Sequence, residues 1–355
     1  MTSANLCNPC SHAFYPLIYN FAHLMKKILI IQTAFIGDVV LATALVEKLH
    51  AYFPAAAIDF LVRKGNESLL HNNPYLNEVL IWNKKEHKTR NLFGMLKQIR
   101  AKKYDAVINV QRFFATGLLT AFSGAKQTIG FDKNPLSFLF SKKIKHVFNL
   151  QHPTHEVERN NELIREFTDD RFTKPVLYPS AADEQFIQSY TGKPFVTMTP
   201  SSVWFTKKYP REKWIDLINK FDPAYTIYLL GGKDNYEECE SIQKEVVNRN
   251  IEILAGKLSF LQSAALMKKA SMNYVNDSAP LHFTSAVNAP ATAIFCSTIP
   301  AFGYTPLSDR SFIVETKEQL SCRPCGLHGK KACPLGHFKC GYSIETTQVL
   351  ETLKS

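Results

Sequence analysis

Apolar and polar residues follow a repeating pattern from Lys26 onward. A short run of Ile, Leu and Val leads through a turn into a helix-length amphipathic stretch, and the recurrence of this order is typical of parallel βαβ units. The pattern therefore predicts an α/β protein. In its first half we expect strands at 27–31, 58–62, 79–82 and 106–110, and helices near 39–52 and 92–102.

The alternation is interrupted at 174–180, where two prolines stand in a stretch without periodicity, as in a linker. It then restarts, with strands expected at 195–199, 226–230, 251–254, 272–275 and 291–295, and helices near 210–221, 236–247, 260–269 and 279–287. Two doubly wound units can turn the carboxyl ends of both sheets toward one cleft, where ligands bind. We expect an extension at 1–24, domains at 25–178 and 179–355, and an active site between the two domains.

Composition and charge narrow the function. The 355 residues are 45% apolar and 21% charged, which is typical of a globular chain with two cores. The 42 basic and 31 acidic residues give a net charge of +11, so an anionic partner is expected. No apolar run is long enough to span a bilayer, and residues 1–24 lack the basic start of a secretory signal. These features favour a cytoplasmic location.

The first turn with candidate chemistry is Gln32-Thr33-Ala34-Phe35-Ile36-Gly37-Asp38, which runs into a helix expected from Val39. Its single glycine fits neither a dinucleotide fingerprint nor a P-loop, which makes NAD enzymes and P-loop ATPases poor candidates. Asp38 then has two interpretations. It caps the helix, or it is a carboxylate facing the cleft, ionised because the helix dipole lowers its pKa and therefore able to accept a proton.

Two further turns follow strands of the second half. The stretch from Thr199 to Pro210 carries hydroxyls and two lysines, which suit a phosphate, although a solvated lysine pair on a loop is equally consistent with the sequence. The stretch Asn276-Asp277-Ser278-Ala279-Pro280-Leu281-His282 begins a helix whose N–H groups can hold an anion. Simple capping by Asp277 or Ser278 and a packed His282 remain alternatives.

Glycines end another strand of the second half, at Gly231-Gly232-Lys233-Asp234. Glycine at a strand's carboxyl end admits a closely approaching ligand, and Asp234 is suited to hydrogen-bond a ribose hydroxyl. An ordinary glycine turn is the alternative.

Four cysteines lie near the C-terminus, at Cys322, Cys325, Cys333 and Cys340. The first pair has metal-like spacing, and His328 and His337 lie between the thiols, so a structural zinc site is one interpretation. Disulfides, disfavoured in a reducing compartment, and unligated thiols packed in a loop are the others. Cys7 and Cys10 form another Cys-x2-Cys pair, in the extension.

Together these residues resemble the ADP-heptose lipopolysaccharide heptosyltransferases of glycosyltransferase family nine. The resemblance covers the chain from Met25 onward. It is carried by KKILIIQTAFIGDVVLATALVEKLHAYFP, by Thr206-Lys207-Lys208-Tyr209-Pro210, by LAGKLSFLQSAALMKKASMNYVNDSAPLHFTSAV and by the cysteine-bearing tail. It implies a GT-B fold in which the N-terminal domain takes the acceptor and the C-terminal domain the nucleotide sugar.

The same resemblance implies roles for single residues. Asp38 looks like the general base, and Lys207 resembles the lysine that neutralises the leaving diphosphate. Ala279 stands where the family often has glycine. The remaining donor-side candidates are Thr206, Gly232, Asp234, Gly256, Asp277, Ser278 and His282, and Gly37 is a candidate on the acceptor side. Because the expected acceptor is anionic, Arg63, Arg112, Lys64 and Lys133 are basic candidates on that side, although for each of them alone a solvated surface position is the favoured interpretation.

The implied reaction is an inverting transfer of heptose from ADP-heptose to the anionic inner core of lipopolysaccharide. Asp38 would stand on one face of the anomeric carbon and ADP would leave from the other. No Asp-x-Asp occurs in the chain, so Lys207 and a helix dipole would replace a catalytic metal. Basic charge would dock the enzyme on the cytoplasmic face of the inner membrane.

Two other functions remain open. The chain could use a different nucleotide sugar, because base and phosphate contacts do not read sugar stereochemistry. It could instead be a basic nucleic-acid-binding protein with a zinc-knuckle tail, but it lacks a recognition helix, an aromatic RNA-binding strand motif and a concentrated basic stripe. We therefore expect no nucleic-acid partner.

Overall fold

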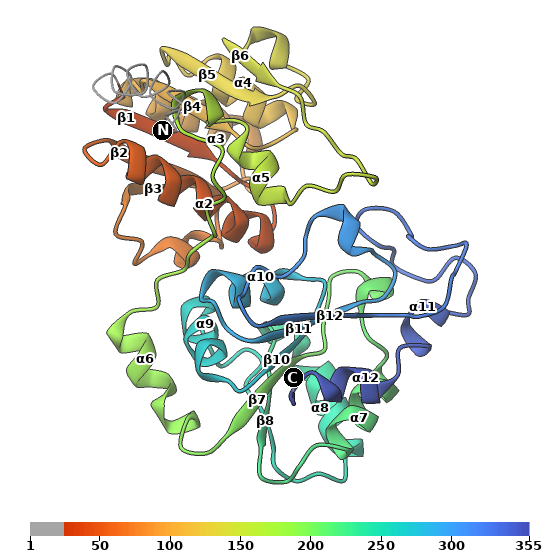
Figure 1. Ribbon diagram of the computed structural model, residues 1–355. Helices are drawn as coiled ribbons and strands as arrows, with labels where there is room; N and C mark the ends of the chain where they lie inside the picture. The colour runs from red at the N-terminus through yellow and green to blue at the C-terminus, as the bar shows by residue number, and fades with distance from the viewer. Residues whose placement is uncertain (1–24, 355) are drawn as a thin grey trace, which may run out of the picture.

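The computed structural model describes residues 25–354. It contains two parallel six-stranded sheets with helices on their faces, which confirms the predicted doubly wound α/β class (Figure 1). We call the sheet of residues 27–144, with its helices, the first unit, and the sheet of residues 195–315, with its helices, the second unit. The predicted extension at 1–24, with Cys7 and Cys10, lies outside the described residues.

The strands of the first sheet follow the order β3-β2-β1-β4-β5-β6, and those of the second the order β12-β11-β10-β7-β8-β9. Every strand pairing is parallel. The strands are β1 (Lys27–Ile31), β2 (Ala57–Arg63), β3 (Leu76–Trp82), β4 (Ala106–Asn109), β5 (Gln127–Phe131), β6 (Lys142–Ile144), β7 (Phe195–Thr199), β8 (Thr226–Leu229), β9 (Ile251–Ile253), β10 (Asn273–Asn276), β11 (Ala291–Phe295) and β12 (Ser311–Glu315).

Amphipathic helices cover the sheets and also join the two units. The helices are α2 (Ile36–Tyr52), α3 (Lys88–Lys102), α4 (Phe114–Ala121), α5 (Glu156–Asn161), α6 (Ala181–Ile187), α7 (Arg211–Asn219), α8 (Tyr236–Glu245), α9 (Phe260–Lys269), α10 (Ala279–Ala286), α11 (Lys339–Tyr342) and α12 (Thr346–Glu351). Helix α2 of the first unit packs directly on α10 of the second, as Figure 1 shows. One apolar cluster continues across this contact, from Val39 and Val40 to Leu281 and Phe283.

The sequence pattern located the central strands and the edge strands β3 and β9, but it missed the strands at the other end of each sheet. β1, β7 and β11 have the predicted bounds, because each is a run of apolar residues in the middle of its sheet. The strands β5, β6 and β12 and the helix α4 were not predicted. The β6 sequence is Lys142-Lys143-Ile144, and such a short, charged edge strand gives no hydrophobic signal.

The connection between the units contains no helix or strand at 171–180. It is preceded by α5, which packs on α2, and followed by α6, which packs on α9. Between residues 25 and 354, no helix is long and apolar enough to cross a membrane.

Candidate active site at the junction of the two units

The order of strands reverses at one point in each sheet. In the first sheet β1 and β4 run side by side, and the chain leaves them in opposite directions, toward α2 and toward Arg112. In the second sheet β7 and β10 occupy the same place, and they lead to Lys207 and to Asp277. Doubly wound sheets bind ligands at such points. The three predicted motifs therefore lie at the binding edges of the two sheets.

The two motifs that begin helices face one another across the junction. A Cβ atom built on Gly37 would lie 2.8 Å from Cδ2 of His282 and 3.5 Å from Cα of Ala279. The first turn of α2 therefore touches the first turn of α10, and only glycine leaves room for this contact. Residues 240 positions apart in sequence thus form one site.

Asp38 lies in the first turn of α2, two residues inside the helix. The helix begins at Ile36 and not at Val39, and Phe35 is its N-cap, so the expectation that Asp38 is the capping residue is wrong. The expected direction of its pKa is also wrong. Burial, and next the negative charge of Glu156, raise the pKa of Asp38 to about 6, although backbone N–H groups and the charge of Lys207 act in the opposite direction. The carboxylate is still ionised at pH 7.5, and a raised pKa makes it a better proton acceptor.

Glu156, which sequence reasoning missed, supplies the second carboxylate beside Asp38. It is the first residue of α5, and its backbone N–H donates to the carbonyl oxygen of Gly303 in the second unit (2.8 Å). Its carboxylate accepts from Nε of Arg159 (2.8 Å) and from the hydroxyl of Tyr304 (3.4 Å). Although burial opposes it, Arg159 and His146 keep the pKa of Glu156 below its usual value. Glu156 is thus a fixed negative charge.

Arg159 fastens α5 to the second unit. Its guanidinium is buried and donates to the carbonyl oxygens of Thr154 (2.6 Å) and Phe302 (2.9 Å). Gly303 has a φ of +81°, and a Cβ there would lie 2.1 Å from the oxygen of Thr154. We call Thr154, Glu156, Arg159, Phe302 and Gly303 the interdomain latch. No sequence pattern marks it, because its partners lie about 150 residues apart.

Lys207 and Asp277 form an ion pair at the carboxyl edge of the second sheet. Nζ of Lys207 lies 2.7 Å from Oδ2 of Asp277, and the hydroxyl of Thr298 donates to the same oxygen (2.6 Å). The Lys207 side chain is 15% exposed and that of Asp277 6%. Asp277 therefore orients the lysine instead of capping α10, whose N-cap is Ser278 without a side-chain capping bond.

The structure separates the two neighbouring lysines. Lys208 turns away and pairs with Glu238 of α8 (2.9 Å), which also accepts from Ser201 (2.7 Å). Only Lys207 points to the junction, so the solvated-pair alternative fails for Lys207. Thr206 is buried below it, where its hydroxyl accepts from Ser297 (2.9 Å).

His282 is buried one turn into α10. Burial, and then repulsion by His155 and Lys207, lower its pKa to about 3, so the imidazole is neutral. Its Nδ1 is buried without a hydrogen-bond partner among the described residues. His282 is therefore a neutral residue that packs against Gly37 through the Cδ2 and Nε2 edge of its ring.

Gly232, Asp234 and Gly256 gather at the ends of β8 and β9. The N–H of Gly256 donates to the oxygen of Gly231 (2.9 Å), and a Cβ on Gly256 would lie 2.9 Å from Cα of Lys233. Asp234 is exposed. These residues lie on the same sheet edge as Lys207, two strands beyond β10 for Gly232 and Asp234 and three strands beyond it for Gly256.

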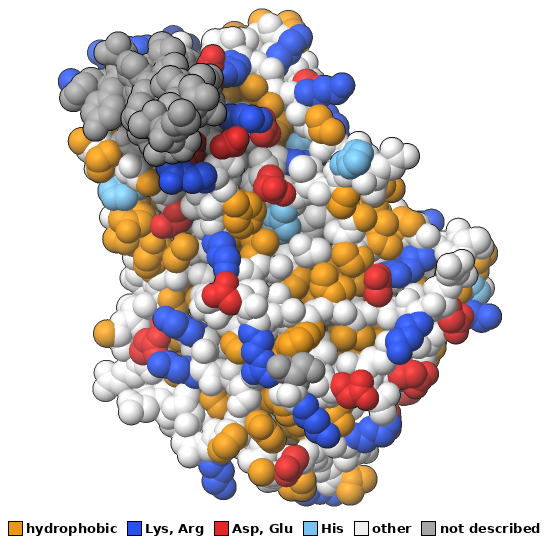
Figure 2. Space-filling model, in the orientation of Figure 1, with side chains coloured by type: hydrophobic (Ala, Val, Ile, Leu, Met, Phe, Trp, Pro, Cys, Tyr) orange, Lys and Arg blue, Asp and Glu red, His pale blue; other side chains and the backbone are white. Residues whose placement is uncertain are grey.

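Basic and aromatic side chains lie together at the carboxyl edge of the first sheet. Arg63 lies over the ring of Phe35 (5.3 Å) and Arg112 over that of Phe113 (5.6 Å). Lys84, which the sequence did not single out, donates to the hydroxyl of Thr33 (2.6 Å), and burial and Arg63 lower its pKa to about 8. Lys64 and Lys133 are exposed. In the face shown in Figure 2, basic and acidic side chains are interspersed over both units.

The tail cysteines approach one another beside the donor side. Cys322, Cys325 and Cys333 line a cavity of about 390 Å³, and Cys340 is buried beside them. The four thiols are free, and within residues 25–354 no group of three or more His, Cys, Asp or Glu is arranged to hold a metal ion. Of the three interpretations of this tail, unligated thiols packed in a loop fit the described geometry.

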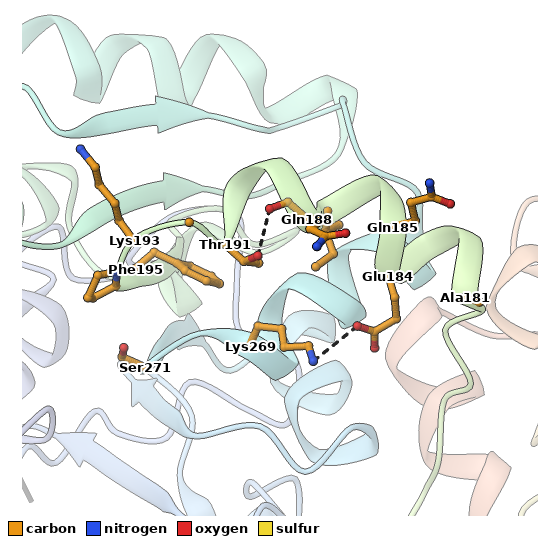
Figure 3. Close-up of a pocket in the computed structure, with 12 residues that line it drawn as sticks. Ala181, Glu184, Gln185, Gln188, Thr191, Lys193, Phe195, Lys269 and Ser271 are labelled. Carbon is orange, nitrogen blue, oxygen red and sulfur yellow. Dashed lines mark hydrogen bonds and ion pairs between the residues drawn. The ribbon is translucent and has the colours of Figure 1, made fainter.

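A cavity of about 1080 Å³ lies elsewhere (Figure 3). It is lined by α6, the amino end of β7 and the end of α9, where Lys269 lies 3.6 Å from Glu184. None of the predicted site residues lines it. We therefore place the candidate site at the junction and not in this cavity.

Known proteins are similar to this chain in sequence and in fold. Residues 92–335 match the model of glycosyltransferase family 9 (heptosyltransferase). Lipopolysaccharide heptosyltransferase 3 of Escherichia coli is 28% identical over 278 residues, covering 74% of this chain and 82% of that protein. The solved E. coli ADP-heptose lps heptosyltransferase II has a TM-score of 0.76 at 21% identity, covering 93% and 98% of the two chains. E. coli heptosyltransferase WaaC, solved with ADP, has a TM-score of 0.71 at 17% identity, covering 93% and 99%. These likenesses confirm the expected GT-B fold.

Proposed function

The chain belongs to glycosyltransferase family 9, the heptosyltransferases, and is a glycosyltransferase; we propose that it moves a heptose from ADP-heptose to the inner core of lipopolysaccharide. The donor is supported by the names of relatives, one of which is an ADP-heptose enzyme and another of which was solved with ADP. The acceptor is supported by the lipopolysaccharide heptosyltransferases among the relatives.

The acceptor hydroxyl is activated by Asp38. Its carboxylate stands at the carboxyl edge of the first sheet, and its raised pKa suits proton transfer near neutral pH. The attacking oxygen loses its proton to Asp38 as it forms the bond to the anomeric carbon. The bond from that carbon to the diphosphate breaks on the opposite face, so the reaction inverts the anomeric centre.

The leaving diphosphate is stabilised by Lys207 and by the N–H groups of the first turn of α10. Asp277 and Thr298 hold the ammonium in place, so little reorganisation is needed as charge develops. Thr206, Ser278, Ala279 and His282 shape the same pocket for the donor. Gly232, Asp234 and Gly256 are suited to contact the nucleoside. Positive charge from the chain itself takes the role that a metal plays elsewhere, and we propose a metal-independent reaction.

The acceptor is anionic and attached to a membrane, and the basic residues near Asp38 suit it. Gly37 lets the two helices meet, while Arg63, Arg112 and Lys84 place positive charge around the end of the first sheet. We propose that the enzyme docks on the cytoplasmic face of the inner membrane through such charges. The proposed domain division, with the acceptor at 25–178 and the donor at 179–355, follows from these positions.

The observation that carries the proposal is the contact of Gly37 with His282 and Ala279, which brings the base and the phosphate-binding turn into one site. The first test measures thermal stabilisation of the protein by ADP, UDP, GDP, CMP and NAD. A ligand at 100 times its Kd raises the free energy of unfolding by about 2.7 kcal/mol. We expect a shift with ADP, followed by transfer from ADP-heptose to heptose-deficient lipopolysaccharide. A shift with UDP or GDP alone would replace the donor, and no shift would refute a nucleotide-sugar enzyme.

A further inference from the structure

The cysteine-bearing tail reaches back to the donor side. Its segment from Arg323 to Lys330 lies more than 100 residues after Thr206 and Lys207, yet the two segments pair through their backbones. The N–H of Thr206 donates to the oxygen of Lys330 (3.1 Å), and the N–H of Lys330 donates to the hydroxyl of Thr206 (2.8 Å). The tail therefore forms one wall of the turn that carries Lys207.

A second set of bonds ties the tail to the loop after β11. The N–H of Cys325 donates to the oxygen of Ser297 (2.9 Å), and Arg323 donates to the oxygens of Cys296 (2.8 Å) and Thr298 (2.7 Å). Ser297 in turn bonds to Thr206, and Thr298 bonds to Asp277. Thr206, the neighbour of Lys207, and Asp277, its ion-pair partner, are thus each bonded to a residue that the tail holds, Ser297 and Thr298 respectively.

Gly329 makes the closest approach of the tail to the lysine itself. Its φ is +77°, and a Cβ there would lie 2.9 Å from Cγ of Lys207, 3.0 Å from the hydroxyl of Thr206 and 3.3 Å from Cβ of Trp204. A methyl group at position 329 therefore has to displace the aliphatic part of Lys207 and the hydroxyl of the buried Thr206.

We propose that Arg323, Cys325, Gly329 and Lys330, which we call the tail clamp, are positioning residues that hold Lys207 in its phosphate-binding place. This proposal rests on the proposed role of Lys207 at the donor diphosphate. It gives the cysteine-bearing tail a function in donor binding that does not require the thiols to bind a metal.

The test compares two alanine substitutions in the same loop. Gly329→Ala and Gly326→Ala both place a side chain at positive φ, +77° and +79°, but nothing lies within 4 Å of a Cβ at 326. Backbone strain is therefore matched, and the two variants differ in the contacts that a Cβ at 329 makes with Lys207, Thr206 and Trp204. We expect Gly329→Ala to weaken ADP binding, measured by titration calorimetry, about tenfold relative to Gly326→Ala, since misplacing a binding group by about 1 Å is costly.

A double-mutant cycle with Lys207→Ala separates positioning from general damage. In the Lys207→Ala background, Gly329→Ala should cause no further loss of ADP affinity. A loss that adds fully to that of Lys207→Ala would overturn the proposal. If Lys207→Ala alone keeps the parental affinity, the proposed role of Lys207 fails and the clamp fails with it. If Lys207→Ala loses affinity but Gly329→Ala behaves like Gly326→Ala, only the clamp fails.

Thr206 provides a second route if Gly329→Ala does not fold. Thr206→Val removes the oxygen that accepts from Lys330 and Ser297 and keeps the side-chain shape, whereas Thr206→Ser keeps the oxygen. We expect weaker ADP binding for the valine variant, restored in the serine variant, and no effect of the valine on top of Lys207→Ala. Equal affinities of the valine and serine variants would contradict the clamp.

Discussion

Asp38 and Asp277 occupy matching places in the two units but have opposite surroundings. Each follows a strand at the point where its sheet reverses order, and each stands at the start of a helix. Asp277 is neutralised by Lys207 at 2.7 Å, whereas among residues 25–354 no cation lies within ion-pair distance of Asp38. A second carboxylate, Glu156, acts on Asp38 instead. The same local pattern thus yields an ion-paired carboxylate in one unit and, in the other, the unpaired carboxylate that we propose as the proton acceptor.

Removing the charge of Asp38 is the strongest way to break this comparison. Asp38→Asn should lower the kcat of heptosyl transfer about a thousandfold, within the usual contribution of a general base. ADP affinity, measured by calorimetry, should stay at the parental value because the proposed nucleotide site lies in the second unit. Turnover close to that of the parent would show that another group accepts the proton.

The two aspartates should also differ in their effect on stability. Asp277→Asn leaves a buried Lys207 without its partner, which costs about 3 kcal/mol in the free energy of unfolding. Asp38→Asn should raise that free energy by up to about 3 kcal/mol at pH 8, because the folded protein there carries an ionised carboxylate that burial disfavours. Chemical denaturation of both variants measures the difference. Destabilisation by both would remove the contrast.

The stability gain of Asp38→Asn should depend on pH. The folded-state pKa of about 6 lies above the ordinary value of 3.8, so the penalty for ionising Asp38 is absent below about pH 3.8, grows between pH 3.8 and 6, and is complete above pH 6. The stability gain of the variant should therefore be present at pH 8 and nearly absent at pH 4. The kcat of the parent should fall as the pH drops below about 6.

One added methyl group can break the contact between the first turns of α2 and α10. Gly37→Ala places a Cβ 2.8 Å from Cδ2 of His282, and relief of this overlap should cost about 1–3 kcal/mol in stability and lower kcat. Gly94→Ala is the matched control, because Gly94 lies in the helix α3 and nothing lies within 4 Å of its Cβ. That substitution should stabilise the protein by up to about 1 kcal/mol. Similar behaviour of both variants would show that the Gly37 contact is unimportant.

Among these substitutions, Glu156→Gln should have the smallest effect on kcat. It removes the negative charge that raises the pKa of Asp38, so the acid limb of the kcat profile should move to lower pH. Glutamine keeps an oxygen for Arg159 and Tyr304. An unchanged acid limb, with stability retained, would show that Glu156 does not act on the base.

The sequence predicted what local chemistry determines. Asp38, Lys207 and Asp277 each follow an apolar run and precede a helix, and this order is enough to assign them to sheet edges. The surroundings of these residues could not be predicted in the same way. The pKa of Asp38 depends on Glu156, which lies 118 residues away in a stretch without periodicity, and the place of Lys207 depends on a tail about 120 residues later. Only the packing of α5 on α2 and of the tail on Thr206 reveals these partners.

The interdomain latch has a consequence for turnover. Its bonds from Glu156 and Arg159 to Gly303 and Phe302 join the two units beside the reacting groups. Moving α5 away from Phe302 and Gly303 would break these bonds and expose a buried guanidinium to solvent. Substrate entry and product departure in such an enzyme are therefore coupled to this small set of contacts. A slow opening step there would limit the turnover rate even when the chemistry is fast.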